Sequence, residues 1–77
     1  MQERIVIDPE ICNGRPTIRG TRITAQTVLG HLSAGDSIED VLDAYPRLTR
    51  EDVLAALAYG AMLSGNSVTF ESIRRGA

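Results

Sequence analysis

The sequence predicts a mainly α domain in which a short N-terminal β-hairpin precedes three helices. The hairpin is indicated by the β-branched run Ile5–Ile7 and by Asn13-Gly14 a few residues later, because Asn-Gly favours the tight turn between two strands. The helices are indicated by residues that commonly cap helix N-termini and that stand before apolar residues at helical spacing. These residues are Thr24, Ser37 and Thr49.

A chain of 77 residues is long enough for one domain. A domain of this size buries about 60% of its unfolded surface, and its core contributes only a few kcal/mol. We expect a single domain over 1–77, with a strand and hairpin arm at 1–23, a three-helix homeodomain-like bundle at 24–64 and a C-terminal tail at 65–77. A partner subunit would add buried apolar surface to this small core.

The arm is expected to contain two short strands. Glu3–Asp8 forms the first, because it is rich in β-branched residues and the following Pro9 cannot donate to a ladder. Pro16–Ile18 returns beside it after the Asn13-Gly14 turn. Two strands alone are marginally stable, so we expect the hairpin to lie on the helices, to pair across a dimer, or to do both.

The first two helices are each expected to bury one apolar stripe. Thr24 caps the first helix and Gly35 ends it. Ser37 begins the second and resembles a capping box with Asp40, and Pro46 ends this helix. The stripes are Ala25, Val28, Leu29 and Leu32 in the first helix and Ile38, Val41, Leu42 and Tyr45 in the second.

The third helix is expected to begin at Thr49 and to carry apolar residues on two sides. Glu51 and Asp52 stand in its first turn, where the helix dipole favours carboxylates. The inward side is predicted to be Val53, Leu54, Leu57, Ala58 and Ala61. The second side, predicted to be a dimer or partner interface unless it belongs to a broad core face, is Ala55, Tyr59 and Met62.

The tail alternates apolar and polar residues. Val68 and Phe70 fall on one side, and Arg74 and Arg75 stand near the end. The pattern is consistent with a short strand, with a frayed end, or with a segment that becomes ordered on a partner.

Residues 14–24 form a cationic and extended segment. All eight basic residues of the chain are arginine, and the net charge is −2, so any DNA contact must come from local clustering. Arginine favours bidentate contacts to carboxylate or phosphate. An alternative is that Arg19 and Arg22 pair internally with Asp36, Asp40 or Asp43. The candidate DNA-binding residues are Arg15, Arg19, Arg22, Arg47 and Arg50.

The second and third helices have the outline of a helix-turn-helix. A short helix, a turn that contains Pro46 and Leu48, and a longer helix follow one another. Against this function, Glu51 and Asp52 are expected to face DNA phosphates. Binding of the third helix in the major groove is therefore unfavourable, unless the positive charges of Arg47 and Arg50 outweigh these two carboxylates.

We expect neither catalysis nor a metal or other cofactor. His31 is the only histidine, and it stands mid-helix as an ordinary surface or boundary residue. Glu39, Asp40 and Asp43 form a solvated acidic face, because no histidine or carbonyl-rich loop completes a coordination sphere. The chain is therefore not expected to be an enzyme.

The sequence favours the cytoplasm. Cys12 is the only cysteine and precludes an internal disulfide, which together with the lack of a signal peptide fits a reducing compartment. No apolar run approaches the roughly 20 residues that a membrane span needs.

The sequence resembles a known family over about residues 8–63. The motif residues are Gly14-Arg15-Pro16-Thr17-Ile18-Arg19-Gly20-Thr21-Arg22, then Leu32-x-x-Gly35, Tyr45-Pro46-x-Leu48-Thr49 and Ala55–Tyr59. They resemble the antitoxin-type family of domains of unknown function numbered 433. The resemblance implies a small homeodomain-like or winged three-helix domain that is encoded beside a PIN-like ribonuclease toxin and acts as its antitoxin.

Three functions are therefore open. The first is the antitoxin of a type II pair, a homodimer or a hetero-oligomer with its toxin, with additional repression of its own operon. The others are a stand-alone DNA-binding transcriptional regulator and a protein-interaction module without nucleic acid. PIN-like nucleases hold metal ions in a carboxylate cluster, which guanidinium groups can enter. The candidate toxin-binding residues are Arg74, Arg75 and Phe70 from the tail, with Arg15, Arg19 and Arg22 as alternatives.

Overall fold

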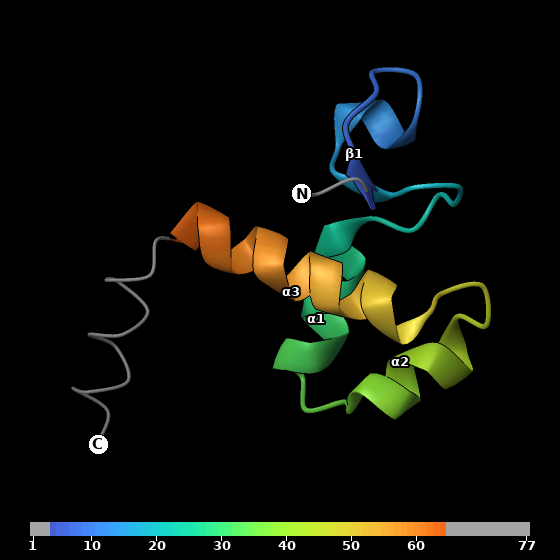
Figure 1. The fold of residues 1–77 in the computed structure, drawn as a ribbon, viewed down its shortest axis with the longest axis vertical. Helices are drawn as coiled ribbons and strands as arrows, with labels where there is room; N and C mark the ends of the chain where they lie inside the picture. The colour runs from blue at the N-terminus through green and yellow to red at the C-terminus, as the bar shows by residue number, and fades with distance from the viewer. Residues whose placement is uncertain (1–3, 65–77) are drawn as a thin grey trace.

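The computed structural model describes residues 4–64, and within them three helices follow a two-stranded hairpin. This arrangement, shown in Figure 1, confirms the predicted mainly α fold. The elements are β1 (Ile5–Val6), the 3-10 turn η1 (Cys12–Gly14), β2 (Thr17–Ile18), α1 (Ala25–Ser33), α2 (Ile38–Ala44) and α3 (Arg50–Ser64).

The hairpin pairs β1 and β2 antiparallel, with Ile5 opposite Ile18 and Val6 opposite Thr17. β1 is shorter than the predicted strand over Glu3–Asp8. Asp8 starts a turn, because its carbonyl accepts the N–H of Ile11 and its carboxylate accepts the N–H of Glu10. The chain reverses through left-handed backbone at Asn13 (φ 58°) and Gly14 (φ 80°), as the Asn-Gly signal predicts.

The predicted starts of the first two helices are confirmed. Thr24 caps α1 through its hydroxyl, which accepts the N–H of Thr27 at 3.1 Å. Ser37 and Asp40 form a reciprocal capping box at the start of α2, with N···O distances of 2.9 and 3.0 Å. Each cap satisfies N–H groups that have no partner within the helix.

The start of α3 is fixed by a polar network around Asp52. Its N–H donates to Thr49 Oγ1 at 3.2 Å, and its Oδ2 accepts the N–H of Thr49 at 3.0 Å. Its other carboxylate oxygen, Oδ1, accepts from Arg4 Nη1 at 3.0 Å. Asp52 is only 8% exposed, so one buried carboxylate both caps α3 and joins it to the arm.

The inward side of α3 differs from the predicted one. Asp52, Val53 and Ala56 are the buried residues of this helix, whereas Leu54, Leu57, Ala58 and Ala61 are exposed. The prediction counted only apolar residues as inward, but the paired carboxylate of Asp52 takes an inward position. The core described by the structure is Ile5, Ile18, Ala25, Val28, Val41, Leu48, Val53 and Ala56.

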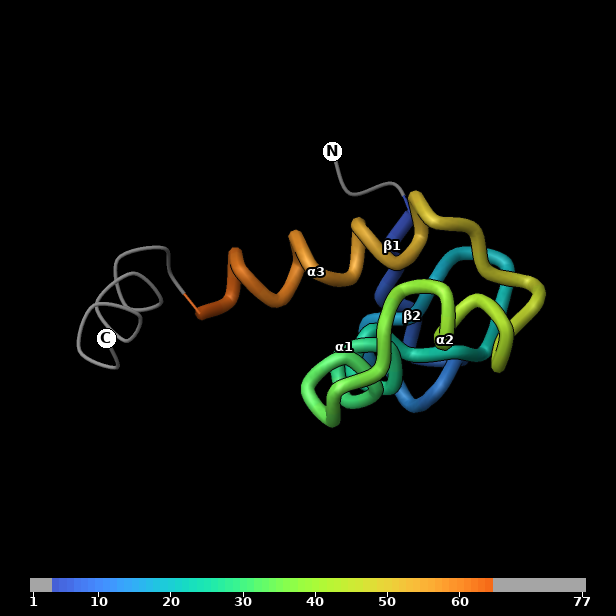
Figure 2. Tube along the Cα trace, turned by 90° about the horizontal axis from the view of Figure 1, so that it is seen from below, coloured from blue at the N-terminus to red at the C-terminus, as the bar shows by residue number. Residues whose placement is uncertain are grey.

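The C-terminal half of α3 extends beyond the rest of the domain. Figures 1 and 2 show the helix crossing α1 and continuing past it, away from α2. The two helices come close where Gly60 meets Leu29, since a Cβ atom at Gly60 would lie 3.0 Å from Leu29 Cδ1. Beyond this point Met62 and Leu63 are exposed.

Candidate functional site: the arginine surface of the arm

The loop between β2 and α1 is held by its own hydrogen bonds. Gly20 adopts a φ of 82°, a left-handed conformation that suits glycine. The N–H and the hydroxyl of Thr21 both donate to the carbonyl of Ile18, at 3.0 and 2.9 Å. The Thr21 hydroxyl also accepts the N–H of Ile23 at 2.9 Å. The loop is therefore a defined turn, and it carries Arg22 at an exposed position.

A hollow of about 490 Å³ lies beside this loop. Arg22 and Arg47 line it together with Ile11, Gly20 and Thr21. Arg47 Nη2 donates to the carbonyl of Gly20 at 3.1 Å, which joins the turn before α3 to the arm. We call this region, defined by Ile11, Gly20, Thr21, Arg22 and Arg47, the arginine surface.

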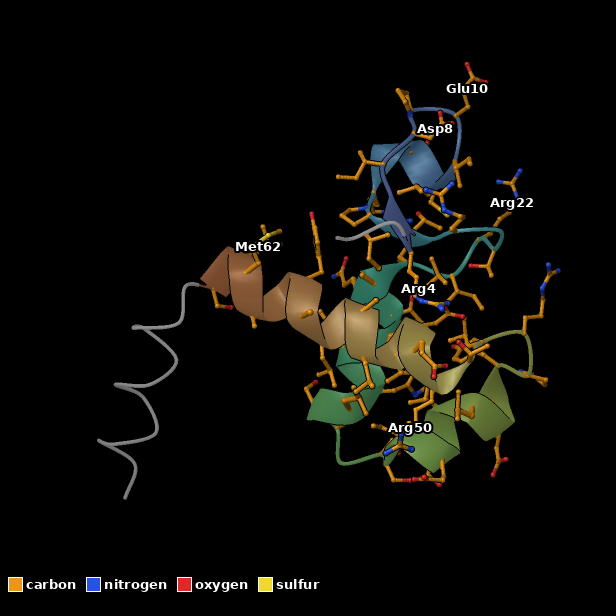
Figure 3. All side chains as sticks on the ribbon, in the orientation of Figure 1. Arg4, Asp8, Glu10, Arg22, Arg50 and Met62 are labelled. Atoms are coloured by element: carbon orange, nitrogen blue, oxygen red, sulfur yellow. The ribbon has the colours of Figure 1, made fainter. Side chains whose placement is uncertain are left out.

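Arg22 projects outward from the arginine surface, as Figure 3 shows. Its carbonyl accepts from Cys12 Sγ at 3.3 Å, whereas its guanidinium has no hydrogen bond or ion pair within residues 4–64. The alternative that Arg22 pairs with Asp36, Asp40 or Asp43 does not hold, because none of the ion pairs within residues 4–64 involves Arg22. Within the part of the chain that the structure describes, the Arg22 guanidinium is therefore unpaired.

The other candidate DNA-binding arginines lie elsewhere. Arg50 forms an ion pair with Glu39 at 3.2 Å. Arg19 is exposed, and its N–H donates to the carbonyl of Arg4. Arg15 Nε donates to the carbonyl of Cys12 at 3.2 Å. Of the five candidate arginines, Arg22 and Arg47 line one hollow.

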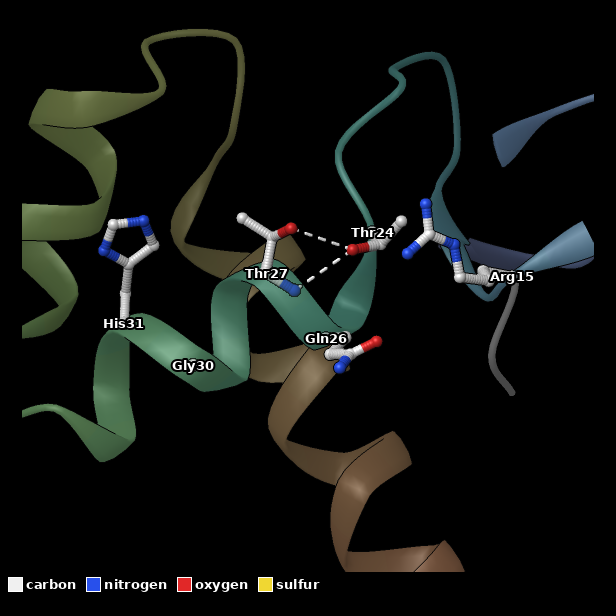
Figure 4. A pocket seen from close by; sticks show the side chains of 6 residues that line it. All are labelled: Arg15, Thr24, Gln26, Thr27, Gly30 and His31. Carbon is white, nitrogen blue, oxygen red and sulfur yellow. Dashed lines mark hydrogen bonds between the residues drawn. The ribbon is translucent and has the colours of Figure 1, made fainter. Parts of the chain in front are cut away.

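Arg15 lines a second, polar hollow of about 470 Å³ along α1. Figure 4 shows Arg15 and His31 on opposite sides of it, with Thr24 and Thr27 between them. The threonine hydroxyls bond each other at 2.9 Å. The side chains of Arg15 and His31 therefore lie apart and do not converge on one group.

His31 has partners that the sequence analysis missed. Its Nδ1 lies 2.9 Å from Asp36 Oδ2, and its Nε2 lies 3.1 Å from the Tyr45 hydroxyl. The His31 and Tyr45 rings meet edge to face, with centroids 5.4 Å apart. The network joins α1 to the end of α2. Two features of the sequence could have indicated this network. Asp36 follows α1 closely, and Tyr45 belongs to the apolar stripe predicted to be buried in the second helix.

The helix-turn-helix outline is present in α2, the turn at residues 45–49 and α3. The turn is closed by the Leu48 N–H, which donates to the carbonyl of Tyr45 at 2.9 Å. The expectation that Asp52 faces phosphates is wrong, because its carboxylate is buried in the Arg4–Thr49 network. Glu51 is the exposed carboxylate of the first turn of α3.

The candidate interface residues of α3 differ in exposure. Ala55 and Tyr59 are partly buried and pack against the core, whereas Met62 is 61% exposed. The candidate toxin-binding residues Phe70, Arg74 and Arg75 lie outside the described residues.

Residues 4–64 contain neither a metal-ligand cluster nor a membrane span. No three histidine, cysteine, aspartate or glutamate side chains there are grouped as they would be to hold a metal ion. In the same range no helix combines the length and the hydropathy that crossing a membrane requires.

Comparison with known proteins places the chain in a family. The model of the family described as "Protein of unknown function (DUF433)" matches residues 5–60. An uncharacterised protein of Sinorhizobium fredii, y4eO, is 36% identical over 58 residues, which cover 75% of this chain and 26% of that protein. The chain therefore spans about a quarter of that relative's length.

A solved structure is also similar. The crystal structure of a DUF433 member protein from Anabaena variabilis has a TM-score of 0.74 and 34% sequence identity to this chain. The match covers 91% of this chain and 68% of that one. The motifs, the fold and these matches agree, and this chain belongs to the DUF433 family.

Proposed function

We propose that this chain is the antitoxin of a type II toxin-antitoxin pair, and that it binds and inhibits a PIN-like ribonuclease. The observation that carries the proposal is the arginine surface, where the exposed Arg22 and the anchored Arg47 line one hollow. The family resemblance supplies the partner class, because antitoxin-type members are expected beside such nucleases.

The chemistry of the arginine surface suits an acidic nuclease pocket. A guanidinium group presents several N–H donors in a planar fork that matches a carboxylate. No carboxylate is among the residues that line the hollow, so neither charge is neutralised there by the site itself. Guanidinium groups placed in the metal-binding carboxylate cluster of a nuclease would compete with metal and RNA.

The geometry also lowers the conformational entropy that the arginine surface would lose when a partner binds. The Thr21 bonds fix the loop that carries Arg22, and the Gly20 carbonyl holds one nitrogen of Arg47. Ile11 adds an apolar contact within the same hollow. A surface that is ordered before binding loses less freedom when the partner docks.

The first test is a pull-down of the tagged chain from its own host, with bound proteins identified by mass spectrometry. Recovery of a small nuclease with an acidic catalytic cluster is the expected result. If no nuclease is recovered, inhibition is no longer supported.

The second test measures inhibition of the recovered nuclease by variants. Arg22→Gln with Arg47→Gln should weaken inhibition on the order of 30-fold, about 2 kcal/mol, because the nuclease carboxylates lose their partners. Arg50→Gln is the matched control, since Arg50 is engaged by Glu39 on another element, and it should leave inhibition within about twofold. Equal inhibition by all variants would remove the arginine surface from the interface.

A second candidate is a DNA-binding regulator without a toxin. It is favoured by the α2–turn–α3 outline and by the burial of Asp52, which leaves one fewer carboxylate facing a phosphate. Binding of DNA by the isolated protein should then fall steeply with salt, because arginines that neutralise phosphates release counterions. A protein that binds neither nuclease nor DNA would fit the third function, a protein-interaction module.

A further inference from the structure

A mainly apolar groove lies where the arm, α1 and the last turns of α3 meet. Its volume of about 470 Å³ falls in the range of pockets that bind small groups. Pro16 lines it from the arm, Leu29 from α1, and Tyr59 and Leu63 from α3. We call the region defined by these four residues and Arg15 the α1–α3 groove.

Arg15 gives the α1–α3 groove a positive charge at its rim. Among the described residues that line the groove, Arg15 is the only charged one. Its Nε donates to the carbonyl of Cys12 at 3.2 Å, and it has no ion pair within residues 4–64. Figure 4 shows its guanidinium pointing toward Thr24, at the start of α1. A complementary occupant is therefore apolar and carries an anionic group beside its apolar part.

We propose that the tail of the same chain, residues 65–77, occupies the α1–α3 groove. The tail lies outside the described residues, and its point of attachment is known. Leu63 lines the groove, and Ser64 alone separates Leu63 from the tail. A segment that is attached at the edge of a groove has a high effective concentration there, so modest contacts are enough to hold it.

The sequence of the tail supplies the apolar and anionic groups that the groove requires. Phe70 is the only phenylalanine of the chain, and Glu71 is the only acidic residue after Asp52. The two are adjacent, so an aromatic ring and a carboxylate enter the groove together. Phe70 packs against Tyr59 within the groove, and Glu71 pairs with Arg15 at the rim.

The tail is also long enough to return to the groove. Gly65 directly follows Ser64, and a glycine just past a helix end favours the left-handed conformation in which the chain leaves the helix. Phe70 stands six residues after Ser64, a length of chain that spans up to about 20 Å. Tyr59 and Leu63 are only about 6 Å apart along α3, so Phe70 can reach both.

This inference concerns the free chain and does not depend on the proposed function, whose site is the arginine surface. Phe70 is a candidate toxin-binding residue in the sequence analysis. The α1–α3 groove gives its ring a binding place on the chain itself.

The first experiment is nuclear magnetic resonance of the full chain. Because Phe70 is the only phenylalanine, its ring protons can be assigned without ambiguity. They should show nuclear Overhauser contacts to the methyl groups of Leu29 and to the ring of Tyr59. Absence of these contacts would overturn the proposal. In a mixture of labelled and unlabelled chains the contacts should arise within one chain, and contacts between chains would overturn the proposal by giving the groove to a second copy.

The second experiment measures the melting temperature of variants of the full chain. Phe70→Ser should lower it by about 5 °C or more, because the ring returns to water. Ile7→Ser is the matched control, since Ile7 is 62% exposed on the arm, and it should lower it by less than about 2 °C. In a Leu63→Glu background, Phe70→Ser should have little further effect. An equal loss with and without Leu63→Glu, or no loss at all, would overturn the proposal.

A third comparison tests the charged pair. Arg15→Gln and Glu71→Gln should each lower the melting temperature by about 2 °C. The double variant should lose no more than the larger of the two single losses, because each change removes the same pair. Losses that add in the double variant would mean that Arg15 and Glu71 do not meet, which would overturn this placement of the tail.

Discussion

The two halves of α3 differ in what surrounds them. The first half is fixed by a buried carboxylate that caps the helix and pairs with the arm, and Val53 and Ala56 beside it lie in the core. The second half crosses α1 at Gly60 and ends in exposed Met62 and Leu63. The first half therefore anchors the helix to the fold, whereas the last turn carries exposed apolar residues. Substitutions should separate the two roles.

The largest effect is expected at Asp52. Asp52→Ala removes the ion pair with Arg4 and the carboxylate that accepts the N–H of Thr49, and it should lower the free energy of unfolding by about 3 kcal/mol. Denaturant unfolding of the full chain measures this change. Glu51→Ala is the control, because Glu51 is exposed in the same turn, and it should change stability by less than about 0.5 kcal/mol. Equal losses would mean that Asp52 does not anchor α3.

The next largest loss of stability is expected at Val53, which is buried, whereas its neighbour Leu54 is exposed. Val53 is fully buried, so Val53→Ala should cost about 2 kcal/mol by leaving a cavity. Leu54→Ala should cost less than about 0.5 kcal/mol in dilute protein, because Leu54 is nearly half exposed. Thermal unfolding at low concentration checks both values. A larger loss for Leu54→Ala would contradict the inward side that the structure assigns.

A smaller effect is expected at Thr49. Thr49→Ala removes the hydroxyl that accepts the N–H of Asp52 but leaves the Asp52 carboxylate in place. Loss of one such cap costs about 1 kcal/mol. The unfolding midpoint should therefore fall by less than in Asp52→Ala. A loss as large as that of Asp52→Ala would mean that the hydroxyl bond dominates the network.

The smallest effect is expected at Gly60, where the two halves of α3 meet. Gly60→Ala gains about 1 kcal/mol of helix propensity, but its Cβ would lie 3.0 Å from Leu29 Cδ1. Leu29 is only partly buried and its methyl group can move, so stability should change by less than about 1 kcal/mol. A loss of stability above about 2 kcal/mol, measured by the same unfolding assay, would show that Leu29 cannot move away from the added Cβ atom.

The local structure was predictable because it depends on residues close in sequence. Thr24 and Ser37 cap the helices that they were predicted to cap, and Asn13-Gly14 turns the arm. The inward side of α3 was not predictable in this way. It includes Asp52, whose carboxylate pairs with Arg4, 48 residues away in the sequence.

The candidate site was predictable in composition but not in arrangement. The arginines of residues 14–24 were recognised, yet the sequence could not tell that Arg22 would share a hollow with Arg47 from the turn before α3. The network of His31, Asp36 and Tyr45 was missed for a similar reason. Tyr45 was placed on an inward stripe, but the sequence could not show that its hydroxyl would meet His31 from α1.

Hydrogen–deuterium exchange of the full chain tests the central claim, that the arginine surface is where the nuclease binds. The chain is measured alone and then with the recovered nuclease. We predict that the nuclease slows exchange in residues 19–23 and 46–48 and leaves exchange in α3 unchanged. If the nuclease slowed exchange only in α3 and left the arm unchanged, the account would be contradicted.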